Sequence, residues 1–315
     1  MTFRDLVDHW TQIRDSSSDP TRHQVMVDLD RIMHPISDPQ LEQLYQNLIQ
    51  SFDQFELRLD QLKTQTKDQI EQDEKEWFQR SSQWYQDTLD QRLSQTLEFA
   101  NNFRNQQVKI SAETEKLYIS RVMRYSDWHH AGMIIHPGRE PFMQHMVGND
   151  PLYIVDESHA LLEPVLNDYN QAYQRRLRTC VIEEQFDQEI LVKVPDGQIG
   201  VCLAYHYFNF RPFEMIKQYL IEIYRKLKPG GVLIMTFNDC ERLAGLSWVE
   251  MNYACYNRAS LIKDLAMRLN YTVEFFYHDQ GPSSWIELRK PGTLTSLRGG
   301  QTLAKILPNP VANSK

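Results

Sequence analysis

Residues 131–158 read AGMIIHPGREPFMQHMVGNDPLYIVDES. An apolar run leads into a turn that contains Gly138, and a second apolar run ends at Asp156. Short apolar runs bounded by glycine and proline are typical of buried strands, so this stretch predicts a strand, a turn, a helix and a second strand. This is the layout of a nucleotide-binding β-α-β unit, although the turn has a single glycine where such units usually have several.

The rest of the C-terminal half continues this alternation. Strands are predicted at 132–138, 151–157, 178–184, 197–210 and 230–239, and helices at 158–175 and 212–228. Strands that alternate with helices form a parallel sheet covered on both faces. The last two apolar runs, 271–279 and 283–290, are joined only by Gln-Gly-Pro, which is too short for a helical crossover, so they predict an antiparallel hairpin. We therefore expect an α/β fold with a mainly parallel sheet.

The N-terminal part of the sequence has a different distribution of glycine and proline. Glycine is absent before Gly132, and no proline lies between Pro39 and Pro137, which predicts a long helical region. Apolar residues recur in it at intervals of three and four, the spacing of a heptad seam: Leu41, Leu44, Leu48, Phe52, Phe55, Leu59 and Leu62. Two arrangements fit this pattern. One is a continuous helix that pairs with other copies of the chain, and the other is an antiparallel hairpin that bends near residues 63–75.

These patterns divide the chain into four parts. We expect short helices within 1–38 (near 3–14 and 20–33), a long helix or coiled coil over 39–112, an α/β domain over 113–292 and a polar tail over 293–315. The long helical region is predicted to be an interaction module, because a single helix cannot bury its own apolar seam.

Composition disfavours several classes of function. The chain has 315 residues and a net charge of −8, which argues against a surface that coats nucleic acid. No apolar run approaches the ~20 residues of a membrane span, and the N-terminus lacks a signal-peptide pattern. The cysteines lie far apart without metal-site spacing, which predicts reduced thiols in a cytoplasmic protein with no metal site: Cys180, Cys202, Cys240 and Cys255.

YRKLKPGGVLIMTFND, residues 224–239, combines a helix end, a Lys-Pro-Gly-Gly turn and an apolar strand. This stretch is similar to the helix, turn and fifth strand of the class I S-adenosylmethionine-dependent methyltransferases, and residues of about 115–292 resemble that family. WIELRKPG, residues 285–292, is similar to methyltransferase-like proteins of tailed phages. The resemblance implies a Rossmann-like sheet of seven strands whose last strand is antiparallel, S-adenosylmethionine as cofactor, and a location in the host cytoplasm or the virion.

The resemblance also places the turn that would approach the cofactor. In the family the first strand carries an acid and ends in a glycine-rich turn, because only glycine lets the backbone pass close to the ligand. Here Ile134 stands at the position of the acid, and His136, Gly138 and Glu140 stand at the glycine positions. Gly138 alone keeps the family's residue, so the first motif is degenerate.

Acidic residues follow the next two strands. Asp156 ends the second strand, where a carboxylate accepts the ribose hydroxyls of the cofactor, although a helix cap is the alternative role. Glu183 and Glu184 follow the third strand, where the family places an acid or amide near adenine, and exposed surface charge is the alternative for them. The predicted cofactor-binding residues are His136, Gly138, Asp156 and Glu184.

The fourth strand predicts little about catalysis. It leads into AYHYFNFRP, residues 204–212. Asn209 is not followed by proline and Cys202 is not preceded by proline, so the motifs of the amino-group and cytosine-C5 DNA methyltransferases are both missing. His206 and Tyr205 are the candidate catalytic bases. Methyl transfer depends chiefly on alignment, so an enzyme without a base is the alternative.

Two functions remain open at this point. The first is an S-adenosylmethionine-dependent methyltransferase with an unknown acceptor, assembled into homo-oligomers through residues 39–110. The second is a non-catalytic phage structural or assembly protein that retains the fold and contacts other virion or assembly proteins. The degenerate turn favours the second, whereas Asp156 and the Lys-Pro-Gly-Gly turn favour the first. Neither requires a membrane or nucleic acid. Residues 239–257, after the fifth strand, either cover the acceptor site or form a partly buried helix.

Overall fold

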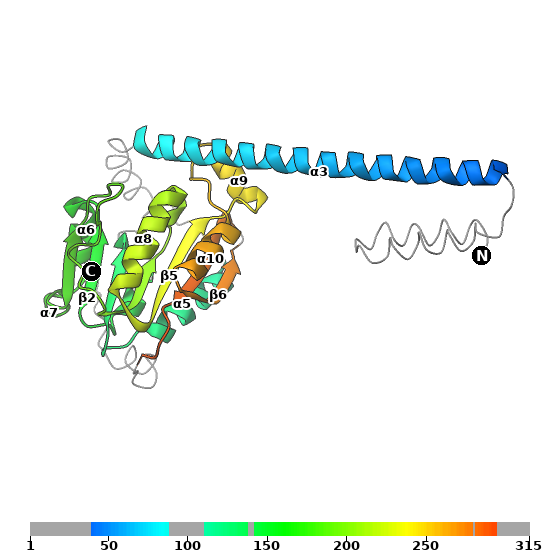
Figure 1. The fold of residues 1–315 in the computed structure, drawn as a ribbon. Coiled ribbons are helices and arrows are strands. Elements are labelled where there is room, and N and C mark those ends of the chain that lie inside the picture. The colour runs from blue at the N-terminus through cyan, green and yellow to red at the C-terminus, as the bar shows by residue number, and fades with distance from the viewer. Residues whose placement is uncertain (1–38, 88–109, 138–141, 280, 295–315) are drawn as a thin grey trace. The chain divides into compact units, whose positions relative to one another are not determined.

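The computed structural model describes residues 39–87, 110–137, 142–279 and 281–294 (Figure 1). The helices predicted near 3–14 and 20–33 and nearly all of the polar tail lie outside these residues. The elements in chain order are α3 (Pro39–Asp87), α5 (Ala112–Tyr125), β1 (Ala131–Ile135), η2 (Met143–Met146), β2 (Leu152–Asp156), α6 (His159–Asn167), α7 (Gln171–Gln174), β3 (Leu177–Val181), β4 (Ile199–Ala204), η3 (Phe208–Phe210), α8 (Phe213–Lys226), β5 (Leu227–Asn238), α9 (Leu243–Glu250), α10 (Ala259–Arg268), β6 (Thr272–His278) and β7 (Ser283–Arg289).

The strands form one sheet in the order β3-β2-β1-β4-β5-β7-β6. β1 to β5 pair in parallel, whereas β7 runs antiparallel to both β5 and β6. The mainly parallel sheet and the antiparallel hairpin predicted from the sequence are both confirmed. The seven strands and the antiparallel last strand also match the arrangement that the resemblance to class I methyltransferases implies.

Both faces of the sheet are buried, which explains why its central strands are almost wholly apolar. Along β5, Val232 and Ile234 point to one face, and Leu233 and Met235 point to the other. α8 and α10 cover the face of Leu233 (Figure 1). α5 and α6 cover the face of Val232. α8 suits this role because its buried side chains recur at helical spacing: Met215, Ile216, Tyr219, Leu220 and Ile223.

The Lys-Pro-Gly-Gly turn lies within the start of β5, and its two glycine positions have no room for a side chain. Gly230 has a φ of 81°, and a Cβ there would lie 2.6 Å from the backbone nitrogen of Leu294. A Cβ on Gly231 would lie 2.8 Å from the carbonyl oxygen of Ile199 on β4. Both glycines are therefore required by the backbone conformation or by the close approach of another strand.

Two predicted elements are wrong in their extent. The strand predicted over 197–210 ends at Ala204, because His206 has a φ of 52° and this left-handed backbone cannot continue the ladder. Among the described residues between β1 and β2, the expected helix is a single 3-10 turn, η2, which Gly148 and Pro151 follow. These described residues therefore contain less helix than the expected β-α-β layout.

The helix predicted over 158–175 is divided into α6 and α7. Asn170 has an extended backbone, and its side chain accepts a hydrogen bond from the backbone N–H of Tyr173. Asparagine in this role is a favourable N-cap, so it begins a new helix instead of continuing the first.

α3 is one unbroken helix of 49 residues, without the bend considered near 63–75. Among the side chains that the structure describes on the seam, Phe55, Leu59 and Leu62 are 62%, 40% and 59% exposed. Pairing of this seam with another copy of the chain stays a prediction. No helix among the described residues is long and apolar enough to cross a membrane. The described residues from Glu74 onward belong to one compact unit.

A buried carboxylate on β7 attaches α5 to the sheet. Glu287 is fully buried, and Arg121 on α5 donates to it from Nε at 2.7 Å and from Nη2 at 2.5 Å. Tyr125 Oη donates to the same carboxylate at 2.8 Å, and Trp285 Nε1 donates to it at 3.1 Å. Such an ion pair contributes little net stability but is costly to break on one side, because the remaining charge stays buried.

We predict that Arg121→Ala lowers the free energy of unfolding by about 3 kcal/mol, because Glu287 loses its cation without gaining access to water. Urea denaturation measures this loss. Lys217→Ala is the control, because Lys217 pairs with Glu214 at 3.3 Å while both side chains are exposed, and its loss should change little. Equal losses for the two variants would contradict the role given to Glu287.

Candidate functional site

The carboxyl ends of the parallel strands meet at one edge of the sheet, where ligands of open α/β folds bind. His136 follows β1, Asp156 ends β2, Glu184 follows β3 and His206 follows β4. The structure therefore brings the described candidate residues to the same edge, and the prediction that Asp156 and His206 share it is confirmed. Gly138 and Glu140 lie outside the described residues.

His136 keeps the backbone conformation of a glycine turn. Its φ is 64°, in the left-handed region that glycine adopts at little cost and other residues adopt rarely. Its backbone N–H donates to the carbonyl of Val155 at 2.7 Å, which ties the end of β1 to β2. The placement of His136 at the first glycine position of the turn is therefore consistent with its backbone, although it carries a buried imidazole.

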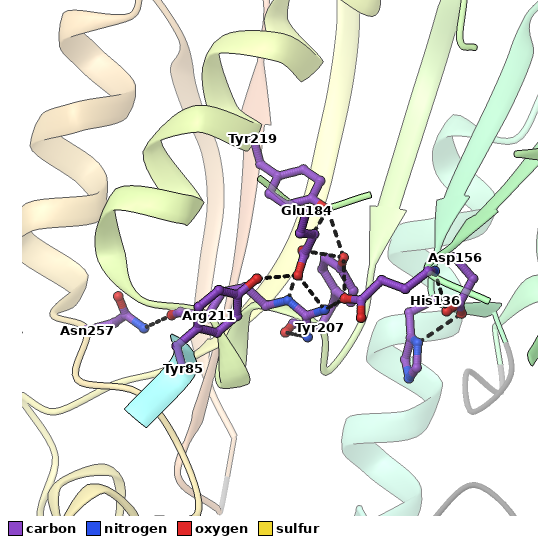
Figure 2. Close-up of polar contacts among 9 residues, drawn as sticks. Tyr85, His136, Asp156, Glu184, Tyr207, Arg211, Tyr219 and Asn257 are labelled. Atoms are coloured by element: carbon purple, nitrogen blue, oxygen red, sulfur yellow. Dashed lines mark hydrogen bonds and ion pairs between the residues drawn. The ribbon is translucent and has the colours of Figure 1, made fainter. Parts of the chain in front are cut away.

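The imidazole of His136 contacts the carboxylate of Asp156, which is predicted to bind the ribose. Nδ1 of His136 is 2.9 Å from Oδ2 of Asp156, as Figure 2 shows. Oδ1 of Asp156 accepts the backbone N–H of Glu157 at 2.7 Å, and the carboxyl group is almost fully buried. Each carboxylate oxygen has a second lone pair, so Asp156 keeps the capacity for one further hydrogen bond on each oxygen.

Glu184 is the centre of a buried polar cluster (Figure 2). Tyr207 Oη and Tyr219 Oη donate to it at 2.6 Å and 2.8 Å, and Arg211 donates from Nε and Nη2, each at 3.1 Å. Tyr85 Oη donates as well. These five donors meet a carboxylate that has about four lone-pair positions, so its hydrogen-bonding capacity is filled by the protein. Its predicted contact with adenine stays a prediction.

The neighbouring acid behaves differently. Glu183 is exposed, in agreement with the surface-charge alternative, whereas that alternative is wrong for Glu184, which is buried. Two consecutive residues just after β3 therefore lie in opposite environments.

Arg211 neutralises two carboxylates at once. It forms ion pairs with Glu157 and Glu184, and its guanidinium lies 3.7 Å from the centre of the Tyr207 ring. Burial by itself would raise the pKa of Glu184, but the guanidinium beside it holds that pKa well below its usual range. Burial would lower the pKa of Arg211, and the two carboxylates raise it well above its usual value. The cluster is therefore a charged network inside the fold.

No motif in the sequence points directly to this cluster. Arg211, Tyr207 and Tyr85 were not among the candidate residues. The acidic pairs Asp156-Glu157 and Glu183-Glu184 follow adjacent strands, and buried carboxylates need a cation close by. The residue that supplies it, Arg211, is the first arginine or lysine after β4.

The two candidate bases lie in different surroundings. Tyr205 is buried in an aromatic cluster, with its ring edge-on to Phe142 at 5.0 Å. His206 is partly buried, and its backbone N–H donates to Oγ1 of Thr236 at 2.7 Å. Its ring lies edge-on to Tyr205 at 4.1 Å. A catalytic role for either residue stays a prediction. The described residues contain no group of three or more His, Cys, Asp or Glu side chains arranged to hold a metal ion.

No protein-family profile matches the sequence, and no curated protein matches it. A chain of the complex between the Haloferax volcanii Trm112 methyltransferase activator and its candidate methyltransferase is similar over 61% of this chain and 93% of that chain, at 13% identity and a TM-score of 0.49. PigF with SAH is similar over 65% and 62% of the two chains, at 17% identity and a TM-score of 0.48. The N-methyltransferase NodS from Bradyrhizobium japonicum is similar over 56% and 87%, at 11% identity and a TM-score of 0.41. The fold is assigned from the order and directions of the strands.

The charged cluster predicts a pH-dependent stability. Because the folded-state pKa of Glu184 lies below its ordinary value of 4.5, its contribution to stability is present above that pH and is lost as the pH falls below it. Arg211→Met removes the cation and leaves a buried carboxylate whose pKa rises, so this variant is stabilised by acid. We expect it to lose about 3 kcal/mol of unfolding free energy at pH 7 and clearly less at pH 4.

Urea denaturation of both proteins at the two pH values tests this expectation. Arg268→Met, at an exposed position in the last turn of α10, is the control and should change stability little at either pH. A loss for Arg211→Met that is the same at both pH values would show that the charge of Glu184 is not the cause.

Proposed function

We propose that the chain is an S-adenosylmethionine-dependent methyltransferase that binds its cofactor where β1 and β2 end. One observation carries the proposal: the buried carboxylate of Asp156 ends β2 directly beside a turn in which His136 keeps a glycine-like backbone. A tight turn beside an acid at the end of the adjacent strand is what a site for a ribose and its neighbouring groups requires. The sheet with its antiparallel last strand supplies the matching fold.

The cofactor would be held chiefly by Asp156. Each of its carboxylate oxygens can accept one further hydrogen bond, which suits the two hydroxyls of a ribose. When bound, the cofactor supplies an activated methyl group on a sulfonium. Ile134 cannot pair with the ammonium group of the methionine part, and His136 places an imidazole on the carboxylate. Each lost polar contact costs about 1–3 kcal/mol, so two losses weaken binding roughly 100-fold or more.

The acceptor side of the site lies beyond β4 and β5. His206 follows β4 at the same edge, and it is the base that we place nearest to an acceptor, with Tyr205 second. α9 follows β5, and exposed apolar side chains lie on it at Leu243 and just after it at Met251 and Tyr253. An acceptor with apolar surface, instead of a base in DNA, suits this composition.

A second candidate function is favoured by a different observation. Both oxygens of Asp156 already have protein partners, and Glu184 is filled by five protein donors. In a chain that retains the fold but no longer binds the cofactor, the buried carboxylates at the strand ends would need protein partners of this kind. In that case the protein is a non-catalytic component of a phage particle or of its assembly.

We also propose that the chain forms a homo-oligomer through α3. The seam side chains Phe55, Leu59 and Leu62 are exposed, and their spacing is that of a helix that pairs with another helix. A second copy of the same chain presents the same seam, so it is the simplest occupant.

Calorimetric titration with S-adenosylmethionine and S-adenosylhomocysteine tests the first function. We expect micromolar or weaker binding to the native protein and no detectable binding to Asp156→Ala. His136→Gly should bind about tenfold more tightly, because the competing imidazole is removed and the turn gains a residue suited to its φ.

Glu163→Ala, at an exposed position in α6, is the matched control and should bind like the native protein. If the native protein shows no heat with either ligand up to millimolar concentration, the non-catalytic function is the better one. Tight binding that survives Asp156→Ala would place the site on other residues.

Light scattering at micromolar concentration tests the assembly. We expect an oligomer for the native chain and a monomer for the double variant Leu59→Asp and Leu62→Asp, because paired seams cannot bury unpaired carboxylates. Leu57→Asp is the control, since Leu57 is exposed but lies off the seam. A native chain that is monomeric would refute pairing between copies.

A further inference from the structure

The last turns of α3 belong to the same compact unit as the α/β fold and pack closely against it. The ring of Phe78 lies edge-on to Tyr256 at 5.1 Å. Oγ of Ser81 accepts the backbone N–H of Tyr256 at 2.8 Å, and Glu74 pairs with Arg258 at 2.7 Å. These contacts combine apolar packing, a backbone hydrogen bond and an ion pair, so this part of α3 is docked specifically.

Tyr85, in the last turn of α3, is the point at which the helix reaches the candidate site. Its side chain is 1% exposed, and its hydroxyl donates to Oε2 of Glu184 (Figure 2). Its ring lies edge-on to Phe186 at 6.2 Å, which fixes the direction of the hydroxyl. Tyr85 therefore inserts a donor from the N-terminal helix into the cluster at the ends of β2 and β3.

The cluster connects this donor to the ribose carboxylate. Oε2 of Glu184 accepts hydrogen bonds from Tyr85 and from Nη2 of Arg211, and the same Nη2 also pairs with Glu157. The backbone N–H of Glu157 in turn holds Oδ1 of Asp156 at 2.7 Å. If Tyr85 no longer donates, Oε2 loses that contact and relies more heavily on Nη2 of Arg211. The guanidinium is then drawn away from Glu157, the residue that adjoins Asp156.

We propose that Tyr85 is a positioning residue of the cofactor site: α3 completes the site by holding Glu184, and through Arg211 it holds the end of β2 on which the ribose binds. The inference rests on the proposed methyltransferase function, because it concerns the affinity of the same site. It goes beyond that function by making the N-terminal helix a part of the site. The same helix carries the seam that is predicted to assemble the chain.

Tyr85→Phe in the full-length chain tests the proposal, because it removes one hydroxyl and keeps the ring that packs on Phe186. We expect the Kd for S-adenosylhomocysteine, measured by calorimetry, to rise about fivefold, a typical effect of a residue that acts through others. Tyr173→Phe is the matched control. Tyr173 is a buried tyrosine whose hydroxyl has no hydrogen-bond partner within the described residues, and its variant should bind like the native protein.

A double-mutant cycle with Glu184→Gln separates positioning from loss of stability. Glu184→Gln should itself weaken binding, and Tyr85→Phe should add little in that background, because both act through one contact. Native binding together with an unchanged Kd for Tyr85→Phe would overturn this inference alone. Additive effects of the two substitutions on Kd would also overturn it, since they would show that Tyr85 does not act through Glu184. A native protein without affinity for the ligand would overturn the proposed function and this inference with it.

Discussion

A single buried guanidinium holds together the edge of the sheet where the candidate site lies. Arg211 is enclosed by the fold, and it pairs with Glu157 after β2 and with Glu184 after β3. Arg211 and Glu184 are buried, and Glu157 is partly buried. Charges this close are tolerated only if each keeps its partners, because desolvation of an unpaired charge costs several kcal/mol. The ends of the two strands, the start of α8 and the last turn of α3 are thereby held in one arrangement.

The same constraint explains the character of the candidate cofactor site. The carboxylates that would recognise a nucleoside are buried at the edge of the sheet. They therefore need hydrogen-bond partners within the protein whether or not a ligand is present. His136 and the backbone of Glu157 do this for Asp156, and Arg211 with three tyrosines does it for Glu184. Asp156 retains free lone pairs and Glu184 does not. Ribose recognition is therefore the part of the site that this geometry supports best, and recognition of adenine by Glu184 is the part that it supports least.

Hydrophobic periodicity and the positions of glycine and proline were enough to predict the elements of the α/β fold. Parallel strands buried on both faces are apolar runs, and the short Gln-Gly-Pro link between the last two apolar runs left no other pairing than an antiparallel hairpin. The errors are local. β4 ends early because His206 adopts a positive φ, and η2 replaces a full helix. Neither event changes hydrophobic periodicity, which is the signal that such predictions rely on.

For the site, the sequence was sufficient to place Asp156, His136 and His206 at one edge, because the carboxyl ends of parallel strands always lie together. It could not show that the imidazole of His136 lies on Asp156, or that Tyr85 and Glu184 meet across 99 positions of the chain. Strand ends follow from local periodicity, which reaches only a few residues. Contacts between side chains depend on rotamers and on the packing of helices from distant segments. The partners of each buried charge are therefore a property of the assembled fold and not of any motif in the chain.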